Sequence, residues 1–200
     1  MKGMIKDALI LFAITLIAGL MLGVVNDITK EPIARQEQKA KTEACQNVFA
    51  DAASFEEQEM EDATQALADA GLTGADIDEL MAAKDASGSL LGYVITVTDH
   101  EGYGGDIQFS MGVTTDGVLN GISLLSISET AGLGMRAGEV LVPQFENKDV
   151  DRFTYTKTGS TADSEIDAIS GATITTNAVV NGVNAGLVYF DEFLKGGSAQ

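Results

Sequence analysis

The pattern of apolar and polar positions divides the chain into a long apolar start and a mixed body. Residues 8–25 are an uncharged, mostly apolar run, which is just long enough to cross the hydrocarbon core of a bilayer. We therefore expect a transmembrane anchor over residues 1–26, a helical stalk over 27–50 and a folded domain over 51–200. A cleaved signal peptide is the alternative for the apolar run. However, the run is longer than a signal-peptide core, and no clear small-residue cleavage site follows it.

The first part of the expected domain has helical composition. Residues 55–70 are rich in Glu and Ala, a composition that predicts a surface helix. Residues 75–84 predict a second short helix, which ends before Ser87 and Gly88.

The apolar period then changes to two, which is typical of half-buried strands. The alternation predicts strands over residues 93–97, 107–113 and 118–127, and Asp116-Gly117 is a hairpin turn signal between the last two. Strands joined by short turns pair antiparallel. With helices before and after them, they indicate an α+β fold built on an antiparallel sheet.

A final helix is predicted by apolar residues three or four positions apart, a spacing that puts them on one helical face. These residues are Val179, Val183, Leu187, Phe190 and Leu194. A short polar run, Asp167–Thr173, opens this helix.

Charge is distributed unevenly along the chain. The net charge is −18, and residues 1–41 carry six Lys/Arg against four Asp/Glu, whereas residues 42–200 carry six against 26. Nucleic acid is an unlikely partner for such an acidic domain, because a phosphate backbone requires the opposite sign. The composition indicates a well-solvated domain attached to a different kind of segment.

Few residues are available for metal or nucleophilic chemistry. Cys45 and His100 are the only cysteine and histidine, fewer than Cys/His zinc sites or iron–sulfur clusters require. A single cysteine also forms no intrachain disulfide. We expect no metal site and no catalytic side chain, so any redox chemistry needs an organic cofactor.

Ser170, Gly171, Ala172 and Thr173 lie where an anion can be seated. Free backbone N–H groups and the positive end of the helix dipole point out of a helix N-terminus, and a phosphate binds well there. Thr173 has a hydroxyl that can be esterified to such a phosphate. The alternative is a plain helix cap, because Ser and Thr cap helices without any ligand.

Two glycine-bearing loops flank the predicted strands. They are Gly102-Tyr103-Gly104-Gly105 and Glu129-Thr130-Ala131-Gly132-Leu133-Gly134. Glycine in turns explains both. The functional alternative is a close backbone approach to a flat ligand, with Leu133 or Tyr103 against its ring.

The order of these features resembles the covalent-FMN subunits of ion-translocating redox complexes, which are RnfG of the Rnf complex and NqrC of the sodium-pumping NADH:quinone reductase. The resemblance covers nearly the whole chain, and its length is closer to that of RnfG. It implies FMN joined through its phosphate to Thr173 by a phosphoester bond, with Thr175 and Thr176 as second choices. A flavin transferase would make the bond at a motif that Asp167, Ser170, Gly171, Ala172 and Thr173 match.

On the flavin side, the resemblance implies contacts from the second glycine loop. The residues that match are Glu129, Thr130, Gly132, Leu133 and Gly134. Ala131 departs from the family pattern, in which proline is common at this position.

The function implied is that of an electron-transfer subunit of a membrane-bound, ion-translocating ferredoxin:NAD oxidoreductase, not catalytic alone and assembled with other Rnf membrane subunits. The resemblance places the FMN domain on the extracytoplasmic side of the cytoplasmic membrane. The basic residues that follow the apolar run favour the opposite orientation, but long domains translocate largely regardless of such counts. The alternatives are an NqrC-like subunit and a membrane-anchored binding module with no redox role.

Overall fold

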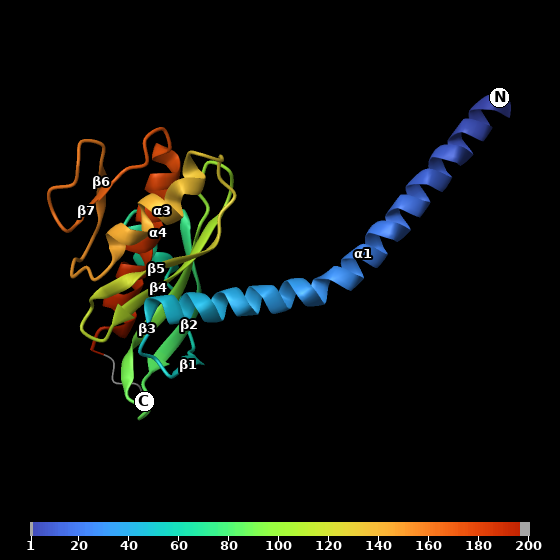
Figure 1. Cartoon of the computed structure of the whole chain (residues 1–200). Helices are drawn as coiled ribbons and strands as arrows, with labels where there is room; N and C mark the ends of the chain where they lie inside the picture. The colour runs from blue at the N-terminus through green and yellow to red at the C-terminus, as the bar shows by residue number, and fades with distance from the viewer. Residues whose placement is uncertain (1, 197–200) are drawn as a thin grey trace. The chain divides into compact units, whose positions relative to one another are not determined.

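The computed structural model describes residues 2–196. The chain forms two compact units, Met1–Ala40 and Lys41–Gln200. A single helix, α1 (Lys2–Val48), runs through the first unit and into the second, and Figure 1 shows it as a continuous ribbon. Within residues 2–196, this is the one helix long and apolar enough to span a membrane, and its most apolar stretch is not buried by the protein.

The body is built on a five-stranded sheet in the order β1-β2-β3-β4-β5, and every neighbouring pair is antiparallel. The strands are β1 (Ser54–Glu57), β2 (Ala75–Lys84), β3 (Leu90–Asp99), β4 (Ile107–Thr114) and β5 (Leu119–Ser126). The α+β class is confirmed, as are the three strands expected from alternation. Gly117, in the turn between β4 and β5, has a φ of +94°, which only glycine adopts without strain.

The helix predicted over residues 75–84 is wrong, because this segment is strand β2. A register shift between Ile77 and Glu79 interrupts the alternation, which hides the period of two from a sequence pattern. Beyond the shift, Leu80 and Ala82 join the main core and Ala83 joins a second cluster on the other side. Pairing on both edges therefore outweighs the helical propensity of Ala, Glu, Leu and Met.

The helix predicted over residues 55–70 is also wrong in its first half. Phe55 pairs with Ala83 in β1, and the helix α2 covers only Thr64–Asp69. Asp62 fixes the start of this helical turn, because its carboxylate accepts hydrogen bonds from the N–H and the hydroxyl of Thr64 (3.0 and 2.6 Å).

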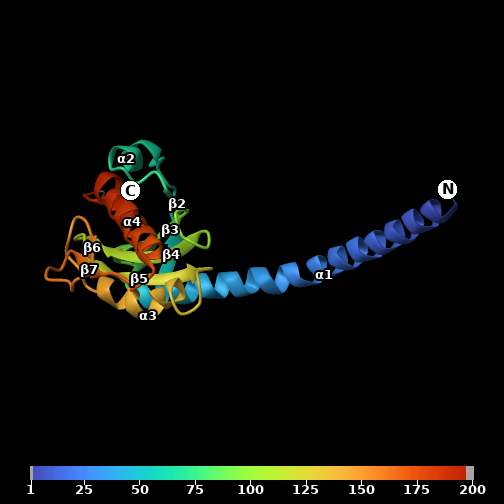
Figure 2. The same cartoon turned by 90° about the horizontal axis from the view of Figure 1, so that it is seen from above.

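Two helical layers cover the sheet. Helix α4 (Thr173–Tyr189) packs across β2, β3 and β4 on one face, as Figures 1 and 2 show. Its predicted apolar stripe is confirmed, since Val179, Val183, Leu187 and Phe190 are buried and Leu194 packs against the same core. The last turns of α1 supply the other cluster, through Cys45 and Val48. Strand β3 is consequently buried on both faces.

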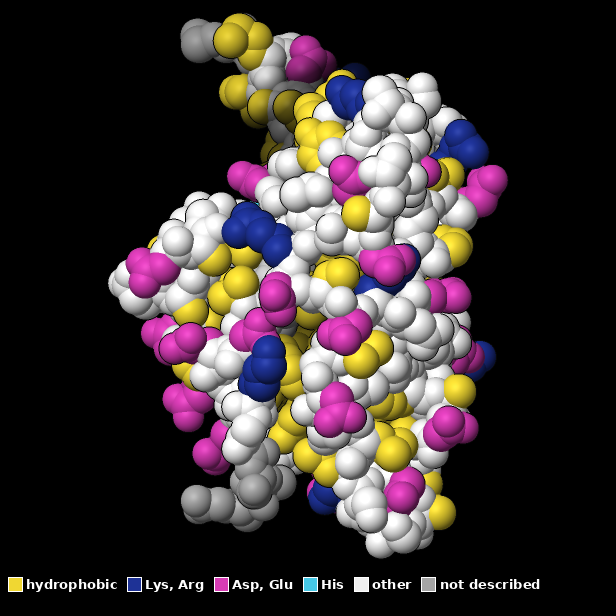
Figure 3. Space-filling view, turned by 90° about the vertical axis from the view of Figure 1, so that its left-hand side faces the viewer, with side chains coloured by type: hydrophobic (Ala, Val, Ile, Leu, Met, Phe, Trp, Pro, Cys, Tyr) yellow, Lys and Arg dark blue, Asp and Glu magenta, His cyan; other side chains and the backbone are white. Residues whose placement is uncertain are grey.

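The connection between β5 and α4 consists of short elements. They are η1 (Gly134–Arg136), α3 (Ala137–Val140), η2 (Val142–Phe145), β6 (Thr154–Thr156) and β7 (Glu165–Asp167). The last two form a parallel pair that the sequence pattern did not predict. A π-helical turn, η3 (Phe190–Leu194), follows α4. Figure 3 shows acidic side chains spread over one face of the protein.

Candidate functional site

Three distant segments meet around a pocket of about 450 Å³. They are the β3–β4 loop, the connection from β5 to η1, and the start of α4. The lining residues are Tyr103, Glu129, Thr130, Leu133, Gly134, Gly171, Ala172, Thr173, Ile174 and Thr175. The structure thus brings together eight of the residues that the sequence motifs selected. The volume lies within the range of small-molecule sites.

The start of α4 is open toward a ligand. The residue that precedes the helix is Ala172, and no side chain caps the helix by a hydrogen bond. The first amides of a helix have no intrahelical acceptor, so they remain available to an anion. The plain-cap interpretation of the polar run therefore lacks the hydrogen bond on which it depends.

Gly171 allows the start of α4 to approach the second glycine loop. Its φ is +80°, which disfavours any residue with a Cβ. A Cβ added there would lie 3.2 Å from Cδ2 of Leu133. The glycine therefore sets both the direction of the chain into α4 and the close packing of Leu133 beside it.

Thr173, Thr175 and Thr176 differ in access to solvent. Thr173 is half-buried and lines the pocket, whereas Thr175 is 1% exposed and Thr176 is fully buried. The Thr176 hydroxyl donates to the carbonyl of Ala172 (2.9 Å) and accepts from the N–H of Ile169 (3.1 Å). Of the three hydroxyls, that of Thr173 is the most accessible.

Four of the selected residues do not line the pocket: Asp167, Ser170, Gly132 and Thr176. The Asp167 carboxylate accepts the N–H of Ser160 (2.6 Å). The Asp167 backbone N–H and carbonyl bind the side-chain amide of Gln144 (2.7 and 3.1 Å). Asp167 therefore organises the segment that leads into α4. Ser170 is exposed, and Gly132 has a φ of +76° in the loop before Leu133.

The rim of the pocket is apolar. Among the described residues of the body, five large apolar side chains are exposed, and all except Met60 belong to the pocket or adjoin it: Tyr103 (69%), Leu133 (40%), Met135 (45%) and Ile174 (50%). No lining residue is Lys or Arg. The sequence motifs did not reveal Ile174 and Met135. The signal for Ile174 is an apolar side chain off the buried stripe of the helix.

The loop that carries Tyr103 is anchored at both ends. Asp99 is fully buried and accepts the N–H of Glu101 (2.9 Å) through Oδ1, while its Oδ2 has no partner among the described residues. Burial raises the pKa of Asp99 to about 6. His100 lies between Asp106 (2.9 Å) and Asp76 (3.1 Å), and hydrogen bonds to these two carboxylates raise the pKa of its ring.

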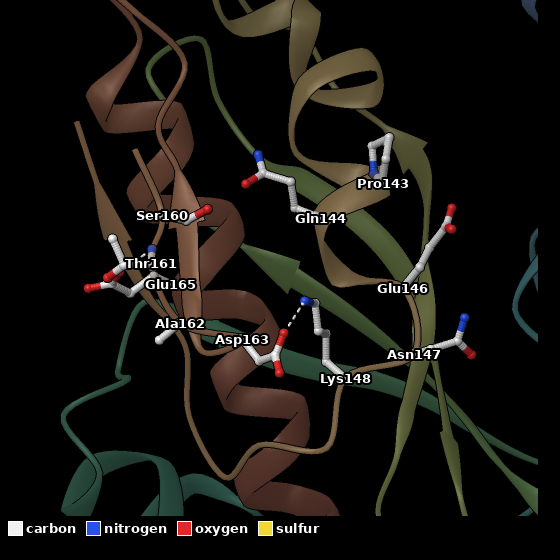
Figure 4. Close-up of a pocket in the computed structure, with 10 residues that line it drawn as sticks. All are labelled: Pro143, Gln144, Glu146, Asn147, Lys148, Ser160, Thr161, Ala162, Asp163 and Glu165. Atoms are coloured by element: carbon white, nitrogen blue, oxygen red, sulfur yellow. Dashed lines mark hydrogen bonds and ion pairs between the residues drawn. The ribbon is translucent and has the colours of Figure 1, made fainter. Parts of the chain in front are cut away.

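A larger hollow of about 600 Å³ lies between η2 and the β6–β7 segment (Figure 4). Its lining is mostly polar, and Lys148 and Asp163 form an ion pair across it (3.0 Å). No residue selected from the sequence lines this hollow. The smaller pocket, with its free helix amides and apolar rim, is the better candidate for a flat anionic ligand.

Comparison with known families agrees with this choice. Residues 102–188 match the FMN-binding domain, a range that begins at the Tyr103 loop and includes all three pocket segments. Residues 1–48 match the RnfG N-terminal region. The fold and the site thus define a flavin-binding protein with an N-terminal apolar helix.

Relatives with known names cover almost the whole chain. The RnfG-type component of the Na⁺-translocating ferredoxin:NAD⁺ oxidoreductase complex of Acetobacterium woodii is 32% identical over 197 residues, which cover 97% of this chain and 95% of the relative. The corresponding component of an ion-translocating oxidoreductase complex of Methanosarcina acetivorans is 26% identical, with 94% and 95% covered. The chain belongs to the RnfG family, whose members are components of these complexes.

A solved structure of NqrC from Shewanella oneidensis is also similar. It is 22% identical, has a TM-score of 0.47, and covers 57% of this chain and 58% of its own.

Proposed function

We propose that this protein relays electrons through an FMN esterified to Thr173, as a subunit of a membrane-bound, ion-translocating ferredoxin:NAD oxidoreductase. A separate flavin transferase would attach the flavin. In the linkage, the oxygen of the Thr173 hydroxyl bonds to the flavin phosphorus and the hydroxyl proton is lost. The mass of the chain then rises by one FMN less one water.

The observation that carries the proposal is the position of the Thr173 hydroxyl. It lies at an uncapped helix start, in a pocket whose rim holds nearly all the exposed large apolar side chains of the body. The free amides suit a phosphate, and Leu133, Ile174 and Tyr103 suit a flat ring. FMN therefore fits the residues present.

The charge of the protein explains why a covalent bond is useful. A phosphate monoester is strongly negative, residues 42–200 carry 26 Asp/Glu against six Lys/Arg, and no lining residue is basic. Attraction between charges would not hold the cofactor, whereas a phosphoester bond does so without a basic pocket. The helix start then offsets part of the local negative charge.

Electron relay follows from the position of the pocket at the surface. Bound flavin supplies one- and two-electron exchange. The residues of this chain hold and orient it: Thr173 fixes the phosphate end, and the exposed Leu133 and Ile174 place the ring where a partner protein can approach. Glu129 is the only carboxylate in the lining.

The test is flavin attachment in cells that express a flavin transferase. We expect the intact mass to increase by one FMN less one water and the denatured gel band to fluoresce. Thr173→Ala should abolish both signals, and Thr173→Ser should keep them. The control is Thr175→Val, which removes a buried hydroxyl of the same pocket and should leave attachment unchanged.

Several results would contradict this proposal. Fluorescence that persists in Thr173→Ala would move the acceptor to Thr175 or Thr176. A wild-type protein without flavin would favour a membrane-anchored module with no redox role. To test the relay itself, Thr173→Ala is assembled with the other components of the complex, and we expect assembly without electron transfer from ferredoxin to NAD.

We further propose that the body lies on the extracytoplasmic side of the cytoplasmic membrane. Asp116 is exposed in the β4–β5 turn, and Asp116→Cys offers a thiol for a membrane-impermeant maleimide. Cys45 gives little background, because it is buried and burial raises the pKa of its thiol to about 11. We expect labelling in intact cells. Labelling only after lysis would place the body in the cytoplasm.

A further inference from the structure

We infer that Glu129 is a positioning residue, whose carboxylate holds the Gly102–Gly105 loop so that Tyr103 stays at the mouth of the pocket. The identity of what Tyr103 covers rests on the proposed function. The hold on the loop does not, because it is a contact between two parts of this chain.

The carboxylate of Glu129 lies in a narrow slot between the loop and the start of η1. Its Oε1 accepts the backbone N–H of Gly104 (3.2 Å). A Cβ added to Gly102 would lie 3.0 Å from the same oxygen, and one added to Gly134 would lie 2.8 Å from Oε2. Glycine on both sides is therefore what lets the backbone approach this side chain.

The tip of the loop has a second close contact. A Cβ added to Gly104 would overlap the carbonyl oxygen of Ser128, the residue before Glu129. Tyr103 lies between the two tightly packed glycines, and its own side chain is 69% exposed. Few side-chain neighbours hold Tyr103, so its position depends on the backbone of the loop.

The two ends of the loop are fixed without Glu129. Asp99 accepts the N–H of Glu101 at one end, and His100 reaches across to Asp106 at the other. Loss of the Glu129 carboxylate should therefore release only the tip of the loop and leave the sheet intact.

Tyr103 so held can lie against a flat ring at the pocket mouth, because aromatic rings stack in offset arrangements. It would also cover that ring from water. Glu129 thus acts on the cofactor through Tyr103 and explains why the two glycine loops, 25 residues apart between Gly104 and Glu129, work as one structure.

The first measurement needs no cofactor. The full chain in detergent is labelled with ¹⁵N-glycine, and hydrogen exchange of the Gly104 amide is followed by NMR. Glu129→Ala should speed this exchange by about tenfold or more, the effect of losing one hydrogen bond to a charged group. Glu129→Gln keeps an oxygen acceptor of the same shape and should restore most of the protection. Glu139→Ala, on an exposed glutamate, is the control and should change nothing.

The second measurement uses the flavin-loaded protein and iodide quenching of flavin fluorescence. Glu129→Ala and Tyr103→Ala should both increase the accessibility of the flavin, and the double variant should add nothing further. Glu129→Gln should behave like the wild type. Glu129→Gln and Glu129→Ala carry the same charge, so a difference between them reports geometry. Flavin content, read from the denatured band, should be equal in all variants.

The outcomes separate the two proposals. Unchanged Gly104 exchange in Glu129→Ala would overturn the inference. So would a Glu129→Gln protein that retains Gly104 protection but shows the flavin accessibility of Glu129→Ala, since charge rather than position would then be responsible. Wild-type protein without flavin would overturn the proposed function, and the Gly104 exchange would still decide the role of Glu129.

Discussion

Asp99 makes the stability of the body depend on pH in a direction opposite to that of most carboxylates. It is fully buried, and its Oδ2 has no partner among the described residues. Burial, and to a lesser extent the charge of Glu101, raises its pKa from 3.8 to about 6. A charged carboxylate at this position therefore destabilises the folded state.

The sign and the magnitude follow from the difference between the folded and unfolded pKa values. Below about pH 4, Asp99 is protonated in both states and costs nothing. Above about pH 6 it is charged in both, and the shift of about 2 units corresponds to about 3 kcal/mol of lost stability. This contribution is therefore lost as the pH rises between these values.

Asp99→Asn resembles the protonated side chain and keeps an oxygen for the N–H of Glu101. We expect the variant to be more stable than the wild type at pH 8, by up to about 3 kcal/mol, and equal to it at pH 4. The assay is urea denaturation of the full chain in detergent, followed by circular dichroism at several pH values. Asp116→Asn, on an exposed turn, is the control and should show no such dependence. A variant that is less stable than the wild type at every pH would refute the reasoning.

The remaining predictions concern packing and one titration. Gly134→Ala should destabilise the body by about 1–3 kcal/mol in the same urea assay, because the added Cβ would lie 2.7 Å from Cβ of Glu129; an unchanged midpoint would contradict this. Asn184→Ala should cost about 2–4 kcal/mol, because the buried amide binds both the N–H and the carbonyl of Phe153 (2.7 and 2.9 Å). The only histidine, His100, should titrate by NMR above its ordinary pKa, and Asp106→Asn should lower that pKa; an ordinary value in the wild type would mean that the two carboxylates do not hold the ring.

The parts of the fold that sequence predicted are those with an uninterrupted period. Strands β4 and β5 alternate cleanly, and α4 has a stripe from Val179 to Phe190 that the core buries. Strand β2 escaped because a bulge beside Asp78 shifts its period, and its residues favour helices when taken one by one. The pair β6–β7 is only three residues long on each side, too short for any period.

The pocket was predictable in part for a different reason. Residues of the glycine loops and of the run before α4 carry unusual local chemistry, which a sequence displays directly. The role of Asp167 was not visible, because its partners Gln144 and Ser160 belong to segments with no motif. Likewise, no local pattern indicates that Glu129 reaches Gly104, because that contact exists only after the sheet has formed.

The position of α4 near the end of the chain has a consequence for biosynthesis. The strands that it covers, β2 to β4, all precede it by more than 50 residues. A nascent polypeptide that stops short of Thr173 would leave Phe109 and Met111 without the helix that shields them, and such bare surfaces aggregate. Completion of synthesis is therefore the step at which this protein becomes safe from association with its own copies, and truncations within the last 30 residues should be far more harmful than their small size suggests.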